Sequence, residues 1–179
     1  VVFSKRALGS ARQAYRSIHR GIAAGMRILG VDARVVSDAD GKVLPPGAGP
    51  CFRAPAPGEL VAGGRKLVGS AQGRIGEAIL QHGSILVGGR QRLLAVLAVD
   101  GGAAVGPAHD RSAEEVPPVT LRELLGRPTP PDQVMRAVRS GLETELGGEW
   151  DESGYTPEEL SEGKALETKF GSEAWTWRR

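Results

Sequence analysis

The sequence predicts an α+β fold, a mixed or antiparallel sheet packed on helices, and two observations support that prediction. Helical patterns cover 10–29, 129–146 and 156–170. Between the first and second of them, short apolar runs separated by glycine-containing turns are typical of strands in an antiparallel meander. Strands grouped together in one part of the chain, apart from most of the helices, are typical of the α+β class.

The first helix is expected over 10–29. Apolar side chains recur there at spacings of three and four, as on one face of a helix. Ser10 is placed to act as the N-cap, and Gly30 is placed to end the helix. The apolar positions are Ala14, Ile18, Ile22, Met26 and Leu29.

Two later helices each begin with a threonine followed by a proline. Thr129 is expected to cap the first with Pro130 at N1, and Gly147 and Gly148 end it. Thr156 is expected to cap the second in the same way. A short helix over 120–125 precedes both, so the sequence predicts a helical extension at the C-terminal end.

The strands of the predicted sheet are short. Gly63 and Gly64 form a two-residue hairpin signal that supplies positive φ, so Leu60 and Leu67 are expected on paired strands. Residues 1–4 have the pattern of the middle or end of a strand. We therefore expect a further N-terminal part upstream of them. The other expected strands are Glu59–Ala62, Lys66–Gln72, Ala78–Leu80 and Ser84–Val87.

Length and composition indicate a globular chain with one core. The 179 residues carry 40% apolar and 25% charged side chains, with a net charge of +2. Aromatic residues make up 4%, which leaves few rings for stacking on bases, so no nucleic-acid partner is expected. The longest aliphatic run, 93–99, is far below the roughly 20 residues that span a bilayer. We therefore expect no membrane segment.

The single cysteine, Cys51, follows a loop over 38–50 that is rich in Asp, Gly and Pro. A lone cysteine forms no internal disulfide, which makes the cytoplasm the default location. A free cysteine is commonly a small buried hydrophobe. Its place at a loop exit favours a nucleophile instead, and a nearby cation such as Lys66 would lower the pKa of its thiol.

Lys66 follows the Gly63–Gly64 turn. An ammonium beside small residues can pair with a carbonyl or phosphate oxygen of a ligand, and the alternative is a solvated surface lysine. His82 is either a general base or a residue that shapes a strand turn and lines a pocket. His19 and His109 look incidental, and no residue spacing indicates a metal site.

Four segments taken together resemble a known family, and these segments are Cys51-Phe52, Gly64-Arg65-Lys66, Gly69-Ser70-Ala71-Gln72 and Gln81-His82-Gly83-Ser84. The set resembles the lipoate-protein ligase and octanoyltransferase family, which is related in fold to biotin protein ligase. The likeness is to the branch with a cysteine in the loop before the Gly-Arg-Lys turn. It extends to Glu167–Trp175, but the family's upstream Arg-rich segment with paired glycines and a His is absent here.

The resemblance implies an octanoyltransferase of lipoate cofactor synthesis. Cys51 would accept an octanoyl group from acyl carrier protein as a thioester, and Lys66 would contact the acyl carbonyl. A lysine of a lipoyl domain, in a glycine cleavage H protein or a 2-oxoacid dehydrogenase subunit, would then receive the group. No cofactor or metal is implied for this reaction. The implied acyl-binding residues are Gly69, Ser70, Ala71, His82 and Gly83.

Two other functions stay open from the sequence. One is an ATP-dependent lipoate-protein ligase, which would need ATP and Mg²⁺ and leave Cys51 as a bystander. The other is a non-catalytic module that binds lipoyl domains or carrier proteins. The expected organisation is a partial catalytic domain over 1–118, followed by a helical extension of the same domain over 119–179.

Overall fold

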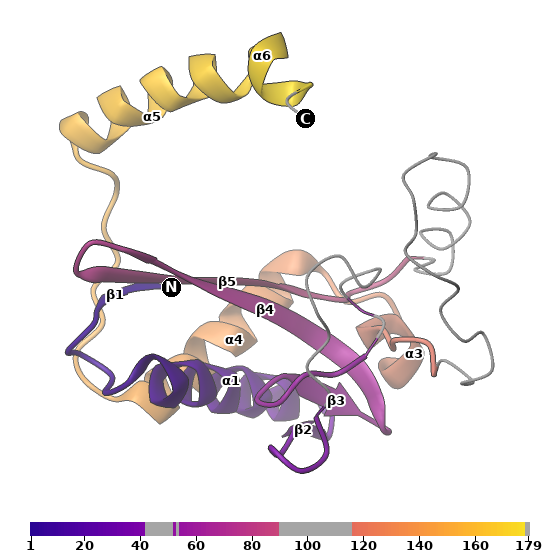
Figure 1. Ribbon diagram of the computed structural model, residues 1–179. Helices are drawn as coiled ribbons and strands as arrows, with labels where there is room; N and C mark the ends of the chain where they lie inside the picture. The colour runs from indigo at the N-terminus through magenta and orange to yellow at the C-terminus, as the bar shows by residue number, and fades with distance from the viewer. Residues whose placement is uncertain (42–51, 53, 90–115, 178–179) are drawn as a thin grey trace, which may run out of the picture. The chain divides into compact units, whose positions relative to one another are not determined.

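The fold was analysed in a computed structural model, which describes residues 1–41, 52, 54–89 and 116–177 (Figure 1). They form two compact units, Val1–Gly148 and Glu149–Arg179. The first unit includes helices beyond residue 118, and the expected boundary at 118/119 stays a prediction. The aliphatic run 93–99 lies outside the described residues.

The first unit is built on a five-stranded antiparallel sheet with the order β1-β5-β4-β3-β2. Strands β4 and β5 form its long central hairpin, and β1 and β2 are the edges (Figure 1). The strand expected at residues 1–4 is confirmed, and it pairs with β5. The strands are β1 (Val2–Ser4), β2 (Ala33–Val35), β3 (Leu60–Ala62), β4 (Arg65–Ile75) and β5 (Ala78–Ile85).

The turn between β3 and β4 confirms the hairpin prediction. Gly63 and Gly64 have φ of +55° and +74°, which suits the two-residue turns that match strand twist. Leu60 and Leu67 do lie on paired strands, although the residue opposite Leu60 is Val68.

The prediction of two strands at 78–80 and 84–87 is wrong. A single strand, β5, runs from Ala78 to Ile85 and pairs with β4 without interruption. Gly83 is therefore not a turn residue. It lies opposite Ser70, whose side chain fills the space that a Cβ at Gly83 would need. His82, expected at a strand turn, lies inside this strand.

The first helix, α1 (Ala11–Ile28), confirms the predicted caps. Ser10 accepts a hydrogen bond from the Gln13 backbone N–H, and the Gln13 side chain completes a capping box. Gly30 follows the helix end with φ of +88°. Both ends of α1 are thus fixed by local sequence.

Helix α4 (Pro131–Leu146) packs along α1, and glycines permit their close approach (Figure 1). A Cβ on Gly25 would come to 2.6 Å from the Ala137 carbonyl oxygen, and one on Gly141 would collide with the Gly21 and Gly25 backbone. The two helices and one face of the sheet enclose the apolar core. Its buried members include Met26, Leu29, Leu60, Leu67, Val68, Leu121 and Val134.

The start of α4 differs from the prediction by one residue. Pro130 is the N-cap, Pro131 occupies N1, and no side chain caps the helix. The residue before a proline is disfavoured in the α region, so Pro131 keeps Pro130 extended, with ψ of 140°. Thr129 is consequently outside capping range. Helix α3 (Leu121–Leu125), capped by Thr120, matches its prediction.

The second unit contains α5 (Pro157–Phe170) and the short α6 (Glu173–Thr176). Thr156 caps α5 as predicted, and Glu159 completes a capping box. The rings of Phe170 and Trp175 meet edge to face with centroids 4.5 Å apart. No residue of α5 or α6 is buried.

Candidate functional site

Lys66 is a buried cation held by a carboxylate. Its side chain is only 5% exposed, and its Nζ lies 2.7 Å from Glu59 Oε2. The same ammonium donates a hydrogen bond to the Ala54 carbonyl oxygen at 3.1 Å and lies 5.4 Å from the centroid of the Phe52 ring. The alternative of a solvated surface lysine is therefore excluded.

An irregularity in strand pairing directs the Lys66 side chain. Lys66 lies opposite Val61, whereas Val68 lies opposite Leu60, so Leu67 is an extra residue on β4. Side chains alternate along a strand, and one extra residue reverses that alternation. As a result, Lys66 points to the face opposite Val68, away from the apolar core.

Small and polar side chains share that face with Lys66. A Cβ placed on Gly69 would lie 3.1 Å from Lys66 Cε, which puts Gly69 beside the lysine stem. Ala71 is two residues further along β4, and the residues paired with Gly69 and Ala71 on β5 are Ser84 and His82. We call this surface, formed by Lys66, Gly69, Ala71, His82 and Ser84, the site face.

Two of the expected acyl-binding residues lie on the other face of the sheet. Ser70 and Gly83 face each other across the β4–β5 pair, one position out of phase with the site face. The Tyr15 hydroxyl donates a hydrogen bond to the Ser70 carbonyl oxygen at 3.2 Å, so α1 supports β4 at this point. The structure thus brings Lys66, Gly69, Ala71 and His82 to one surface, with Ser70 and Gly83 behind it.

Glu59 is a functional candidate that the sequence did not single out. It is 4% exposed. Besides pairing with Lys66, its Oε2 accepts the Ala56 backbone N–H at 2.7 Å, and its Oε1 accepts that of Ser70 at 3.3 Å. A glutamate at the start of an apolar strand-like run, Glu-Leu-Val-Ala, is the one sequence signal that marks it.

Cys51 lies outside the described residues, and its role as nucleophile stays a prediction. Phe52, the residue that follows it in the sequence, is the one whose ring lies near the Lys66 ammonium. The chain segments that flank 42–56 meet closely, because a Cβ on Gly41 would lie 2.5 Å from Pro57 Cδ. Gly41 and Pro57, which lie on either side of the segment that contains Cys51, are thus next to each other.

A buried polar group, His19, lies on the core side of the sheet. His19 is fully buried, its Nδ1 lies 2.9 Å from the Tyr15 carbonyl oxygen, and Gln81 Nε2 is 3.4 Å from the same nitrogen. Gln72 in turn donates to Gln81 at 3.2 Å. Burial lowers the pKa of His19, and burial together with the Glu59 carboxylate raises the pKa of Tyr15. His109 lies outside the described residues.

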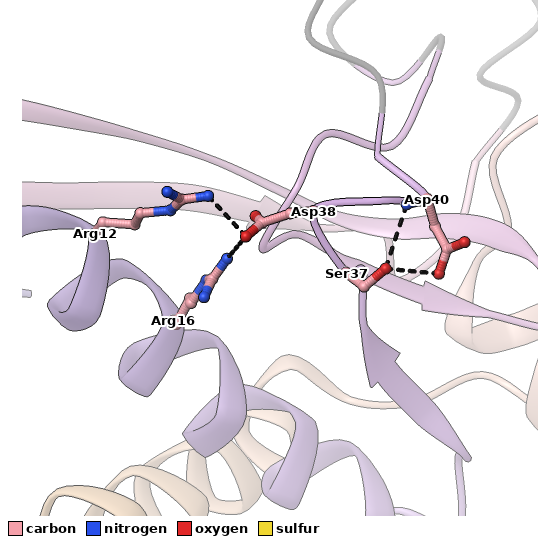
Figure 2. Close-up of polar contacts among 5 residues, drawn as sticks. All are labelled: Arg12, Arg16, Ser37, Asp38 and Asp40. Carbon is pink, nitrogen blue, oxygen red and sulfur yellow. Dashed lines mark hydrogen bonds and ion pairs between the residues drawn. The ribbon is translucent and has the colours of Figure 1, made fainter.

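An arginine pair anchors the segment that leads away from β2. Arg12 and Arg16, one turn apart on α1, both pair with Asp38, as Figure 2 shows, with Arg12 Nη2 at 2.7 Å from Asp38 Oδ2. Hydrogen bonds from Arg16 and Arg12 lower the pKa of Asp38 to about 2. Ser37 donates to Asp40 at 2.8 Å beside them. These contacts fix the segment just before residue 42.

The described part of the chain shows no group of three His, Cys, Asp or Glu side chains placed to hold a metal ion. Within the same residues, no helix has the length and apolarity that crossing a membrane requires.

Comparison with known proteins identifies the family of this chain. Residues 1–143 match the family described as the lipoyl protein ligase A/B catalytic domain. The octanoyltransferase LipM of Kyrpidia tusciae is 36% identical over 175 residues, which cover 96% of this chain and 63% of that protein. The chain thus spans less than two thirds of the length of this relative.

Solved structures show the same fold. Lipoate-protein ligase A bound with ATP superposes with a TM-score of 0.71 at 20% identity, over 97% of this chain and 62% of that one. The bipartite lipoate protein ligase from Thermoplasma acidophilum, described with its E2 lipoyl domain, has a TM-score of 0.64 at 21% identity, over 97% of this chain and 60% of that one. The α+β prediction is confirmed. The chain belongs to the lipoyl protein ligase A/B catalytic domain family.

Proposed function

We propose that this chain transfers an octanoyl group from acyl carrier protein to a lysine of a lipoyl domain, through a thioester on Cys51. One observation supports this most strongly. The buried ammonium of Lys66 lies on the same face of the sheet as several small side chains. It is also close to the ring of Phe52, the residue bonded to Cys51. A cation in that position suits an acyl carbonyl on which negative charge develops.

The reaction takes two acyl transfers. In the first, the Cys51 thiolate attacks the carbonyl carbon of the octanoyl thioester, a new C–S bond forms, and the carrier thiolate leaves. In the second, the lysine amine of the lipoyl domain attacks the octanoyl-enzyme, a C–N bond forms, the amine loses a proton and the Cys51 thiolate leaves. Lys66 stabilises the oxyanion of both tetrahedral intermediates.

The comparisons support the acyl group and the class of acceptor in this proposal. The Kyrpidia tusciae relative is named an octanoyltransferase, which supports the acyl group. The structure from Thermoplasma acidophilum is described with a lipoyl domain, which supports that class of acceptor. Acyl carrier protein as the donor rests on the sequence resemblance, and so does the glycine cleavage H protein or 2-oxoacid dehydrogenase subunit as the acceptor.

The test is a transfer assay without ATP. The protein is mixed with octanoyl-loaded acyl carrier protein, and intact mass should increase by one octanoyl group located at Cys51. Addition of a lipoyl domain should remove that mass from the enzyme and add it to the acceptor lysine. Cys51→Ser should abolish the adduct, and Lys66→Met should slow its formation by about 10²–10³-fold. Transfer that survives in Cys51→Ser would contradict the proposal.

An ATP-dependent ligase is the second candidate, favoured by the likeness of the fold to lipoate-protein ligase A bound with ATP. The same assay separates the two. A ligase would transfer free octanoate or lipoate only with ATP and Mg²⁺, release AMP, and retain its rate in Cys51→Ser. Binding of the lipoyl domain without transfer under either condition would instead identify a binding module.

A further inference from the structure

Glu59 connects the three chain segments that meet at the proposed active site. Its Oε2 pairs with the Lys66 ammonium at 2.7 Å and accepts the Ala56 N–H at 2.7 Å. Its Oε1 accepts the Ser70 N–H at 3.3 Å. One carboxylate therefore holds the segment that follows Cys51, the cation on β4, and the β4 backbone further along.

We propose that Glu59 is a positioning residue for acyl transfer, which fixes the Lys66 ammonium and the 54–56 backbone in a single arrangement toward the acyl carbonyl. The inference rests on the function proposed above. It assigns Glu59 no contact with substrate, because its two carboxylate oxygens are already engaged by Lys66, Ala56 and Ser70.

The burial of this pair argues for a role beyond stability. Both side chains are about 5% exposed, and removing two charges from water costs free energy that the ion pair regains only with good geometry and further hydrogen bonds. Apolar residues of similar volume often stabilise a fold at least as well as a buried ion pair does. Unlike apolar residues, the ion pair holds the Lys66 ammonium in one defined position.

Atoms packed around Lys66 also restrict the movement of its side chain. A Cβ on Gly69 would come to 3.1 Å from Lys66 Cε and 3.5 Å from Glu59 Oε1, so the lysine stem and the carboxylate both lie close against the β4 backbone. The Ala54 carbonyl accepts from the ammonium on another side at 3.1 Å. A shift of the ammonium by about 1 Å is enough to lower a rate by 10²-fold.

The experiment measures single-turnover acylation of Cys51 by octanoyl carrier protein in wild type, Glu59→Gln, Glu59→Asp, Lys66→Met and the Glu59→Gln/Lys66→Met double variant. Glu59→Gln should slow acylation by about 10²-fold at unchanged carrier-protein KM. Glu59→Asp, which keeps the charge, should lie between wild type and Glu59→Gln.

The double variant tests whether Glu59 acts through Lys66. If it does, Glu59→Gln adds little to the defect of Lys66→Met, whereas a merely structural role would multiply the two losses. The matched control is Glu123→Gln, which removes the neighbouring ion pair of Arg65, 3.0 Å long, without touching Lys66. That control should acylate at the wild-type rate.

The outcomes separate the inference from the proposed function. If wild type forms no octanoyl-enzyme, the proposed function fails. If wild type is acylated and Glu59→Gln matches it, or if the double variant loses the product of both single losses, the positioning role is overturned. If Glu59→Gln does not fold, Glu59→Asp decides the question, and a wild-type acylation rate in that variant overturns the inference.

Discussion

Gly83 faces Ser70 across the central strand pair, and the Ser70 hydroxyl occupies the place that a Cβ at Gly83 would take. The same Cβ would lie 2.6 Å from the Gly69 carbonyl oxygen, which cannot move without the strand. We expect Gly83→Ala to lower the free energy of unfolding by about 1–3 kcal/mol, as overpacking does. Urea unfolding measures this.

The control for that substitution lies on the same hairpin. A Cβ on Gly73 meets no atom within 4 Å, so Gly73→Ala should leave stability close to wild type. Ser70→Ala combined with Gly83→Ala should restore only part of the loss, since the Gly69 carbonyl remains in the way. Equal stability of Gly83→Ala and Gly73→Ala would contradict the assigned packing role.

The close approach of α1 and α4 predicts a second loss. Alanine in place of Gly141 gains about 1 kcal/mol of helix propensity, but its Cβ collides with the backbone of Gly21 and Gly25. Backbone on the facing helix cannot rotate away, so we expect Gly141→Ala to be net destabilising by at least about 1 kcal/mol. Gly163→Ala, in the exposed helix α5 with no atom within 4 Å, should instead increase helicity, measured by amide exchange.

The Lys66–Glu59 pair predicts a difference between single and double variants. Lys66→Met leaves the Glu59 carboxylate buried without its cation, and breaking a buried pair costs about 3–5 kcal/mol. Glu59→Gln/Lys66→Met removes both charges while an amide oxygen remains to accept a backbone N–H. The double variant should therefore be more stable than Lys66→Met in urea unfolding, although neither restores transfer. The reverse order of stability would contradict a buried ion pair here.

Asp38 predicts an acid-range titration that NMR can follow. Hydrogen bonds from Arg16 and Arg12 hold its folded pKa at about 2, below the ordinary 3.8. A depressed folded pKa means that these contacts stabilise the fold above pH 3.8 and that the contribution is lost as pH falls toward 2. Arg12→Gln with Arg16→Gln should raise the Asp38 pKa, whereas Arg34→Gln, whose partner is Asp40, should not.

His19 predicts a loss of stability on mild acidification. Burial lowers its folded pKa below 6.5, with Tyr15 and Glu59 opposing and Lys66 adding to that effect. The unfolded chain then binds a proton more readily than the folded one, so stability falls as pH drops below about 6.5. Between pH 7.5 and pH 5.5, the free energy of unfolding should fall less in His19→Asn than in wild type. An identical fall in both would contradict the assignment.

Features encoded by neighbouring residues could be predicted from the sequence. The Ser10 cap, the Gly63–Gly64 hairpin and the Gly147 stop depend on side chains and φ values within one turn, and the structure confirms them. The preceding Gly63–Gly64 turn and the family resemblance mark Lys66 as a candidate site residue. Its burial was not foreseen, since it depends on Glu59 and on the Leu67 irregularity in strand pairing.

The errors share one physical origin, which is that contacts between distant segments decided the outcome. The local sequence around Gly83 predicts a turn. Glycine is needed there because of the Ser70 hydroxyl on the facing strand, and a local pattern gives no information on that contact. The burial of His19 likewise depends on a distant partner, Gln81, which is 62 positions away. The Thr129 error is the exception, since the Pro130–Pro131 pair was itself enough to exclude that cap.

The closure of the chain around 42–56 has a consequence for how much the sequence between these ends can vary. The Val36 N–H bonds to the Glu59 carbonyl at 2.8 Å, and the Gly58 N–H bonds to the Val36 carbonyl at 2.9 Å, so this closure is independent of what lies between. Doubling the length of a closed loop costs only about 0.6 kcal/mol. Changes in chain length within 42–51 should therefore cost little stability, and the Glu59–Lys66 pair lies outside that stretch.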